Sequence, residues 1–274
     1  MKIITSVEDL LQFHPKIRNK GRIGFVPTMG FLHSGHTSLM DIARQHCDVL
    51  VVSIFVNPLQ FAPNEDLARY PKDPEGDVAK CKLHGTDILF MPKEFYPSGH
   101  STTVQVNGLS SGLCGASRPT HFNGVTTVVA RLFGMIQPDI AVFGEKDFQQ
   151  LAIIRQMVRD LAMPINIIGG PLIRDHDGLA LSSRNRYLSP SDRQRALTLH
   201  QSLRWMKSQV TNGARNAEKL LTEAKALLDV DAIDYIDIRN PNTLQAISDI
   251  NGPARAFIAA KLGETRLIDN MELK

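Results

Sequence analysis

The sequence predicts an α/β protein, in which a doubly wound parallel sheet is followed by a smaller α+β domain. Two observations lead to this prediction. In the first part of the chain, short apolar runs typical of strands alternate with segments of helical periodicity, the pattern of βαβ units. After about Arg174 the alternation ends, and two helical segments precede three strand-like runs. Since 274 residues exceed one average domain, we expect one domain over residues 1–174 and a second over residues 175–274, with a single large domain as the alternative.

Apolar runs mark the expected strands of the first domain. The clearest covers residues 49–56, which are almost all apolar and mostly β-branched, as expected for a central strand covered on both faces. The other runs are residues 1–6, 23–26, 87–91, 139–143 and 165–168. Helical periodicity occurs at residues 39–43, 125–136 and 151–158. Because ligands of such sheets bind beyond the carboxyl ends of the strands, polar clusters after these runs are the candidate sites.

The second domain begins with a clear helix start. Ser189 is a suitable N-cap, and Pro190 takes the first helical position. This helix continues to the Asn212-Gly213 break, and a second helix is expected over residues 217–228. Strand-like runs follow at residues 233–238, 254–261 and 265–269. Helices followed by a small sheet predict an α+β domain.

The composition indicates a cytoplasmic protein of enzyme size. Hydrophobic residues at 43% and charged residues at 22% are ordinary for a globular protein, and a formal charge of +3 is too small to predict a nucleic-acid surface. Cys47, Cys81 and Cys114 have no paired spacing and fit free thiols in a reducing compartment. No apolar run approaches the ~20 residues of a membrane span, and the N-terminus lacks a signal-peptide core. We therefore expect neither nucleic acid nor membrane as a partner.

The most informative segment is the loop at residues 26–36, which links an apolar run to a helical pattern. A glycine-bearing loop between a strand and a helix directs backbone N–H groups and the positive helix end toward an anion. His33 and His36 lie three positions apart at the helix start, where both can donate to phosphate oxygens, and Gly35 leaves room for a ligand. The loop predicts a nucleotide triphosphate site. The alternative is a surface turn that happens to contain His and Gly.

A second polar cluster follows the strand at residues 139–143. Lys146 supplies a point charge for phosphate, Asp147 suits a ribose hydroxyl, and Gln150 lies one helical turn beyond Lys146. The alternative is a charged helix start in which Glu145 and Asp147 complement the helix dipole.

A third cluster, at residues 177–185, lies at the expected domain boundary. Ser182, Ser183 and Arg184 offer hydroxyl and guanidinium donors to phosphate oxygens, on a segment placed to close over a triphosphate. The alternative is a solvated interdomain turn with an incidental arginine.

Together these clusters closely resemble the pantothenate synthetase (pantoate–β-alanine ligase) family. The resemblance spans nearly the whole chain, and its motifs agree in order and spacing. They are residues 27–36, 57–61, 68–71, 117–122, 143–150, 178–185 and 266–270.

The resemblance implies a fold of the class I nucleotidyltransferase type, with a Rossmann-like first domain and a smaller C-terminal lid. It also implies that pantoate and β-alanine are condensed with ATP and Mg²⁺ through a pantoyl-adenylate, releasing AMP and pyrophosphate, in pantothenate biosynthesis. A homodimer is implied as well. The Mg²⁺ ligands are left open.

The resemblance also assigns roles to individual residues. The implied catalytic residues are His36, His33, Lys146 and Arg184. The implied ATP contacts are Met29, Gly30, Phe31, Leu32, His33, Ser34, Gly35, His36, Gly144, Glu145, Lys146, Asp147, Ile173 through its backbone, Leu181, Ser182, Ser183 and Arg184. Gln60 and Gln150 match the pair that binds pantoate, and Asn57, Arg118 and His121 are further candidates on the acceptor side.

One position departs from the family pattern. Ser34 stands where members usually carry an acidic residue between the histidine and the glycine. The change removes a negative charge near the phosphates and is expected to shift ATP affinity, while both histidines and Gly35 are retained.

Two other functions are alternatives to this one. A nucleotidyltransferase that attaches AMP to a phosphate acceptor would favour basic residues where this chain has Gln60 and Gln150. A nucleotide-sensing module without chemistry would not need His36, Lys146 and Arg184 together. Pantoate-dependent exchange of pyrophosphate into ATP separates the three.

Overall fold

The computed structural model of the chain describes residues 1–63 and 65–274. The chain divides into two compact units. The first contains Met1–Asn107, Arg118–Glu145 and Gln150–Pro171, and the second contains Gly108–Ser117, Lys146–Gln149 and Leu172–Lys274. Two short segments thus leave the first part of the chain to join the second unit. The domain boundary between residues 174 and 175 stays a prediction.

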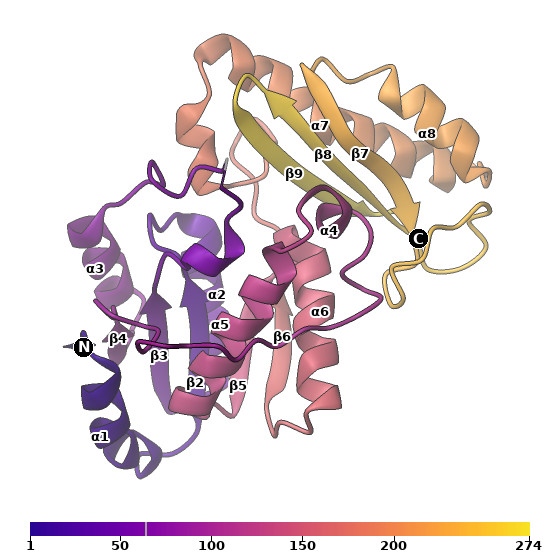
Figure 1. Ribbon diagram of the computed structural model, residues 1–274. Helices are drawn as coiled ribbons and strands as arrows, with labels where there is room; N and C mark the ends of the chain where they lie inside the picture. Colours follow the sequence, from indigo (N-terminus) through magenta and orange to yellow (C-terminus); the bar gives the residue numbers. More distant parts are fainter. Residues whose placement is uncertain (64) are drawn as a thin grey trace. The chain divides into compact units, whose positions relative to one another are not determined.

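The first unit is built on a six-stranded sheet of order β1-β4-β3-β2-β5-β6, in which every pair is parallel (Figure 1). The strands are β1 (Lys2–Ile4), β2 (Ile23–Thr28), β3 (Val49–Ile54), β4 (Ile88–Phe90), β5 (Ile140–Gly144) and β6 (Asn166–Gly170). The predicted doubly wound parallel sheet is confirmed.

Helices cover both faces of this sheet. They are α1 (Val7–Arg18), α2 (Ser34–Arg44), α3 (Pro74–Leu83), α5 (His121–Ile136) and α6 (Phe148–Asp160). Right-handed crossovers place α2 and α3 on one face, because both lead from β2 toward β4 in the strand order, and α1, α5 and α6 on the other. Figure 1 shows α5 in front of the strands and α2 behind them. The connections therefore diverge between β2 and β5, the switch point at which ligands bind in such sheets.

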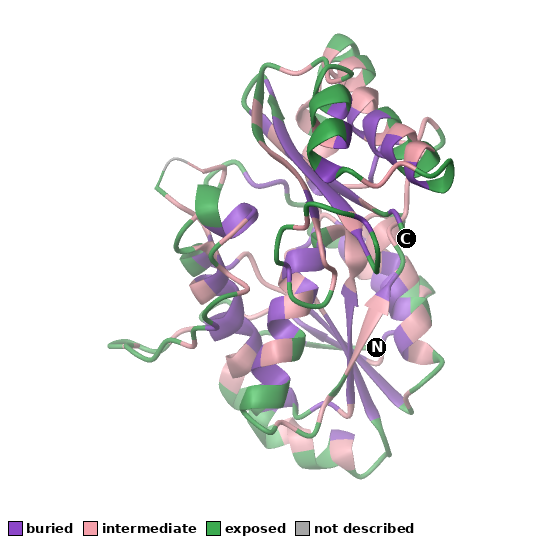
Figure 2. Cartoon of the chain, turned by 90° about the vertical axis from the view of Figure 1, so that its right-hand side faces the viewer, coloured by how far each residue is buried: buried purple, intermediate pink, exposed green. Residues whose placement is uncertain are grey.

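The core of the first unit explains why the strands are nearly all apolar. Val51 and Val52 of β3 are fully buried although their side chains point to opposite faces, and Figure 2 shows the strands mainly in the buried colour. One face packs apolar residues of β2 to β5 against Leu39 and Met40 of α2 and Cys81 of α3. Helices α1 and α3 were not predicted.

The second unit packs two helices on a three-stranded antiparallel sheet, as predicted. The sheet has the order β7-β8-β9, from β7 (Ala232–Arg239), β8 (Arg255–Leu262) and β9 (Thr265–Glu272). The helices are α7 (Pro190–Thr211), which Ser189 caps by accepting the N–H of Asp192, and α8 (Ala217–Lys225). Leu203 and Met206 of α7 are fully buried in a core shared with β8.

Three short helices carry predicted site residues. They are η1 (Pro58–Gln60), η2 (Glu145–Asp147) and η3 (Ser183–Tyr187); a further short helix, α4 (Cys114–Ser117), belongs to the second unit. Among the described residues, no helix is long and apolar enough to cross a membrane. Cys47, Cys81 and Cys114 are free thiols.

Candidate functional site

The loop after β2 turns sharply before α2 begins. Gly30 has φ +85° and Phe31 has φ +50°, so two successive residues take the left-handed conformation. A Cβ on Gly30 would lie 2.9 Å from the Ile54 Cγ2 atom, so a side chain at this position would clash. The side chain of Thr28 stabilises the turn, since its Oγ1 donates to the Ser53 carbonyl (2.8 Å) and accepts the N–H of Gly30 (3.2 Å).

His33 and His36 cap α2 reciprocally. The Nδ1 atom of His33 accepts the N–H of Gly35 (3.2 Å), and the Nδ1 atom of His36 accepts the N–H of His33 (3.3 Å). The two ring centroids are 4.1 Å apart. A ring nitrogen that accepts an N–H carries no proton, so each neutral imidazole has its proton on Nε2. Both rings therefore present an Nε2–H donor at the helix start.

The backbone of this loop differs from the sequence-based expectation. Free N–H groups were expected to face an anion, but those of Phe31 and Leu32 donate to the carboxylate of Asp77, and that of Gly35 donates to His33. The backbone N–H groups of Phe31, Leu32 and Gly35 are therefore already paired within the protein.

Gln60 is held by a buried amide network at the end of β3. Its Oε1 atom accepts from Asn57 Nδ2 (3.1 Å), and its Nε2 atom donates to the Met29 sulfur (3.0 Å). A thioether is a weak acceptor, so a substrate hydroxyl or carboxylate would replace it readily. The Gln60 amide is thus oriented and adjoins the histidine loop.

Asn57 has no hydrogen-bonding capacity left for a substrate. Its Nδ2 atom donates to Gln60 and to the Gly124 carbonyl (3.0 Å), and its Oδ1 atom accepts from Leu59 N (3.2 Å) and Tyr96 Oη (2.9 Å). The side chain is 1% exposed. Its observed role is to orient Gln60.

Arg118 and His121 contact the main chain of Gln60. Arg118 Nη2 and His121 Nδ1 lie 3.2 and 2.9 Å from the Gln60 carbonyl oxygen. Arg118 also forms two 2.5 Å contacts with the Glu65 carboxylate. Burial acts to raise the pKa of Glu65, but the hydrogen bonds and charge of Arg118 outweigh it and lower the pKa. Gly124 allows α5 to approach η1, since a Cβ there would lie 2.2 Å from the Leu59 carbonyl oxygen.

The remaining predicted residues of the first unit follow β5. Gly144 ends this strand and pairs with Gly170 of β6. Glu145 begins η2, and Gln150 lies in the first turn of α6, half-buried. Because β2 and β5 are neighbours, the histidine loop and Gly144 follow the two strands that flank the switch point.

In the second unit, Lys146 is anchored through its main chain. Its carbonyl oxygen accepts from Asn270 Nδ2 (3.0 Å), while its ammonium lies 3.8 Å from the carboxylate of Asp147. Asp147 is exposed.

The segment that carries Ser182, Ser183 and Arg184 begins as a short hairpin. Arg174 pairs with Ala180, and Leu181 donates its N–H to the Ile173 carbonyl (3.0 Å). The hydroxyl of Ser182 then caps η3 by accepting the N–H of Arg184 (3.3 Å), and Ser183 is buried.

Two arginines fix the base of this hairpin. Arg174 donates to both oxygens of Asp269, at 2.7 and 2.9 Å, and to the Gly178 carbonyl. Arg193 of α7 donates to Asp177 (2.9 Å) and to Asp175 (2.6 Å). The predicted phosphate-binding segment is therefore tied to α7 and β9.

The structure groups the predicted residues by unit. It brings His33 next to His36, and it joins Gln60 to Met29, Asn57, Arg118 and His121. The first unit holds Met29, Gly30, Phe31, Leu32, His33, Ser34, Gly35, His36, Asn57, Gln60, Arg118, His121, Gly144, Glu145 and Gln150. The second holds Lys146, Asp147, Ile173, Leu181, Ser182, Ser183 and Arg184.

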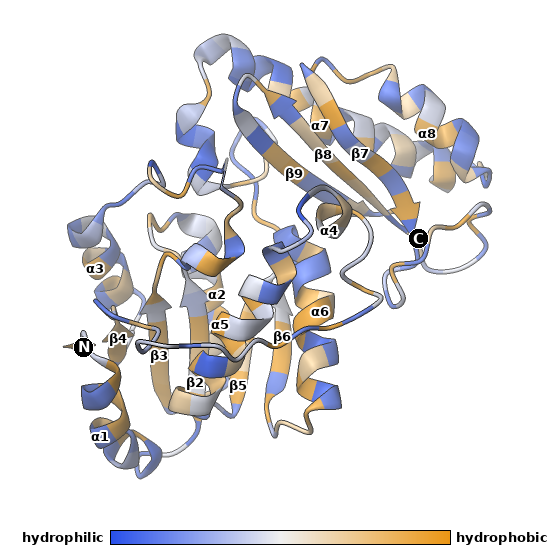
Figure 3. Cartoon of the chain, viewed as in Figure 1, coloured by the Kyte–Doolittle hydropathy of each residue, from blue (hydrophilic) through white to orange (hydrophobic). Residues whose placement is uncertain are grey.

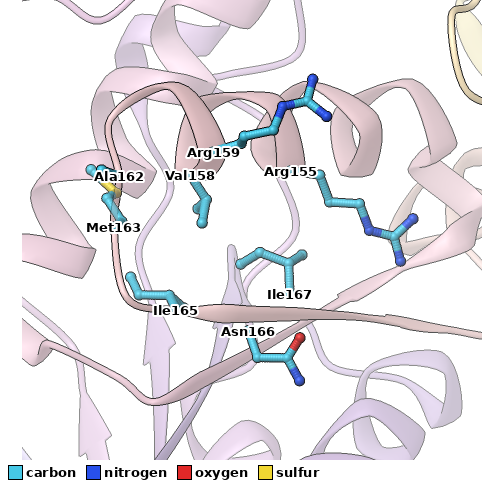
Figure 4. Close-up of a pocket in the computed structure, with 8 residues that line it drawn as sticks. All are labelled: Arg155, Val158, Arg159, Ala162, Met163, Ile165, Asn166 and Ile167. Atoms are coloured by element: carbon cyan, nitrogen blue, oxygen red, sulfur yellow. The ribbon is translucent and has the colours of Figure 1, made fainter.

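A surface pocket of about 500 Å³ lies elsewhere on the first unit (Figure 4). It is lined by Arg155, Val158, Arg159, Ala162, Met163, Ile165, Asn166 and Ile167, where α6 ends and β6 begins. These residues lie at the amino end of β6, opposite the strand ends that carry the polar clusters. Figure 3 shows hydrophobic and hydrophilic positions alternating along α6. Of the residues predicted for the site, none lines this pocket in the described chain.

Comparisons with known proteins match the whole chain to one family. A family model described as pantoate-beta-alanine ligase matches residues 2–272. A pantothenate synthetase of Bradyrhizobium diazoefficiens is 50% identical, over 100% of this chain and 98% of its own length; one of Trichlorobacter lovleyi is 49% identical, over 100% and 99%. The crystal structure of pantothenate synthetase from Thermus thermophilus matches with a TM-score of 0.95 and 45% identity, covering 100% of this chain and 99% of its own. The crystal structure of pantoate-beta-alanine ligase from Francisella tularensis, complexed with beta-gamma ATP and beta-alanine, matches with a TM-score of 0.81 and 34% identity. The match covers 100% of this chain and 98% of that chain.

Proposed function

The chain belongs to the pantoate–β-alanine ligase family, and from this membership we propose how its residues carry out the ligation. A ligase of this family joins pantoate to β-alanine to form pantothenate. We assign the chemistry to two half-reactions, in which ATP and pantoate first give pantoyl-adenylate and pyrophosphate, and β-alanine then displaces AMP. The observation that supports this order is the contact between Gln60 and Met29, which joins the proposed pantoate amide to the nucleotide loop.

The first half-reaction requires stabilisation of growing negative charge. The pantoate carboxylate attacks the α-phosphorus while pyrophosphate leaves, so donors already in place lower the barrier more than they strengthen ground-state binding. The Nε2–H groups of His33 and His36 are such donors, because their capping bonds fix the rings before ATP arrives. Lys146 and Arg184 would supply positive charge, and Ser182 and Ser183 would supply hydroxyls, to the same phosphates.

Neutral amides suit the pantoate site. Gln60 and Gln150 can bind the hydroxyls of pantoate without adding a charge that would hold back its attacking carboxylate. Asn57 orients the Gln60 side chain, and Arg118 and His121 hold its main-chain carbonyl. We therefore assign the substrate contact to the two glutamines and a positioning role to the other three.

Mg²⁺ would enter with ATP as part of the substrate. In residues 1–63 and 65–274, no group of three or more His, Cys, Asp or Glu side chains could hold a metal ion. Mg²⁺ that enters with ATP usually keeps several waters and is held mainly by phosphate oxygens. Its chemical contribution would be to neutralise the leaving pyrophosphate.

The second half-reaction needs no side-chain nucleophile. The free amine of β-alanine attacks the mixed anhydride directly, and AMP leaves.

We also assign a role to Ser34. Its hydroxyl is neutral, so the loop repels the triphosphate less than it would with an acidic side chain at this position. We also propose that the protein acts in the cytoplasm, as its composition indicates, and as a homodimer, as the family resemblance implies. Sedimentation analysis tests the homodimer.

Pyrophosphate exchange tests the proposal. With labelled pyrophosphate, ATP and Mg²⁺, label should enter ATP only when pantoate is present, and β-alanine should not be needed. Exchange that depends strictly on β-alanine would refute the two-step order. Exchange supported by a phosphorylated acceptor in place of pantoate would instead indicate a nucleotidyltransferase.

A further inference from the structure

A buried carboxylate outside the predicted site holds the nucleotide loop. Asp77 lies on α3 and is 2% exposed. Its Oδ2 atom accepts the N–H of Phe31 (2.8 Å), and its Oδ1 atom accepts the N–H of Leu32 (2.7 Å). Both carboxylate oxygens are thus engaged by a loop about 45 residues away in the sequence.

The loop needs such a partner because of its backbone conformation. Phe31 has a Cβ and yet takes φ +50°, which is unfavourable for a residue other than glycine. Gly30 precedes it at φ +85°, and a Cβ there would lie 3.0 Å from the Asp77 Oδ2 atom. The carboxylate therefore packs closely against the turn, and its hydrogen bonds stabilise the left-handed backbone of Phe31.

The surroundings of Asp77 are consistent with a fixed carboxylate. Cys81, one helical turn further along α3, is fully buried in the core that also contains Leu32. The pKa of Asp77 is raised, chiefly by burial and also by the charge of Asp73. The N–H groups of Leu32 and Phe31 and the charge of Lys80 act in the opposite direction. Two N–H donors on two oxygens are best accepted by the ionised form.

We propose that Asp77 is a positioning residue for adenylation: its carboxylate fixes Phe31 and Leu32 so that His33 starts α2 and both imidazoles direct Nε2–H toward the phosphates. This inference rests on the proposed function of the histidine loop. Asp77 itself touches no substrate; it acts through the capping pair that begins one residue after Leu32.

The test compares Asp77→Asn with Asp73→Asn. Asparagine keeps the size of Asp77 but replaces one acceptor oxygen by an N–H₂ group that faces a backbone N–H. Asp73 lies on the same helix end, where its carboxylate caps Gly76 at 3.0 Å, a bond that asparagine retains. Both variants remove one negative charge, so their difference reports the contact with the loop.

We expect Asp77→Asn to lower kcat of pyrophosphate formation at least tenfold, because small displacements of catalytic donors are costly. The KM for pantoate should stay within about twofold, since Gln60 is held by Asn57, and Asp73→Asn should match the wild type. Equal kinetics in the two variants would overturn the proposal.

A double-mutant cycle keeps the test decisive if Asp77→Asn is poorly folded. Glycine takes φ +50° without strain. In a Phe31→Gly background, Asp77→Asn should therefore reduce activity several-fold less, and lower Tm less, than it does in the wild-type background. An undiminished loss of activity in that background would contradict a role through the turn.

Binding of ATP separates this proposal from the proposed reaction. The rise in Tm caused by MgATP should be reduced in Asp77→Asn and retained in Asp73→Asn. If the wild type showed this rise but no pantoate-dependent exchange, the proposed function would fail while the positioning role stood. If all three proteins showed the same rise and the same exchange, the positioning role alone would fail.

Discussion

His33 and His36 cap the start of α2 with the same ring nitrogen, Nδ1. The backbone N–H of His33 donates to Nδ1 of His36, and Nδ1 of His33 accepts from Gly35, so the two rings share one tautomer while capping one helix. A capping contact and a phosphate contact thus use opposite nitrogens of the same ring. Substitutions that mimic one nitrogen or the other can separate the two roles.

His36→Gln and His36→Asn should separate them. An Asn side chain places its oxygen near the Nδ1 position and can keep the cap, whereas a Gln side chain places its amide near Nε2 and can keep the donor. We expect His36→Ala to lower the single-turnover adenylation rate by about 10²-fold, His36→Gln to recover part of the rate, and His36→Asn to recover stability only. The second half-reaction, started from supplied pantoyl-adenylate, should change less in all three variants. Equal slowing of both steps would make His36 a structural residue.

Lys146→Ala should slow adenylation by about 10²-fold or more and leave the fold intact. The lysine ammonium lies 3.8 Å from the Asp147 carboxylate, while Asn270 holds the main-chain carbonyl of Lys146, which alanine keeps. Thermal melting checks the fold, and single-turnover pyrophosphate release checks the rate. Lys219→Ala, at an exposed position of α8, is the control for loss of one positive charge. Unchanged turnover in Lys146→Ala would show that this lysine is a solvated surface charge without a role in adenylation.

The sheet and the second unit could be predicted because their apolar runs carry local information. Residues 49–56 are apolar apart from Ser53, and β3 forms over Val49–Ile54 with both faces buried. Helix α3 carries no such pattern. Its buried positions include the carboxylate of Asp77, which is stabilised by a loop far away in the sequence, so its amphipathic pattern is weak.

The contacts around the proposed site were beyond prediction for the same reason. Arg118 and His121 were candidates for substrate binding from the resemblance, but both contact the Gln60 carbonyl across about 60 residues of sequence. Glu65, which pairs with Arg118, and Gly124, whose carbonyl accepts from Asn57, were not singled out. In the sequence, one is an ordinary loop carboxylate and the other an ordinary helix glycine. The substrate contacts themselves stay predictions.

Asp269→Ala should destabilise the protein and weaken ATP binding together. Asp269 is nearly buried and accepts both guanidinium bonds of Arg174, so its removal leaves a half-buried charge without its partner. We expect the free energy of unfolding to fall by about 3 kcal/mol. The KM for ATP should rise, since Arg174 holds the base of the segment that carries Ser182 to Arg184. Denaturant titration and steady-state kinetics measure the two effects. Glu223→Ala, which removes an exposed pair, should cost less than about 0.5 kcal/mol.

Acid should destabilise the protein in part through Glu65. Arg118 lowers the pKa of Glu65 below its usual value of 4.5, so the folded state binds this proton less readily than the unfolded chain. The stabilisation is therefore complete above about pH 4.5 and is lost as the pH falls through the lowered folded pKa. Between about pH 5 and 3, Tm should fall less steeply in Glu65→Gln than in the wild type. Glu94→Gln, which changes an exposed carboxylate of the same unit, should keep the wild-type slope. Parallel Tm curves for all three proteins would show that the Arg118–Glu65 pair contributes no pH-dependent stability, and would leave Gln60 without this electrostatic support.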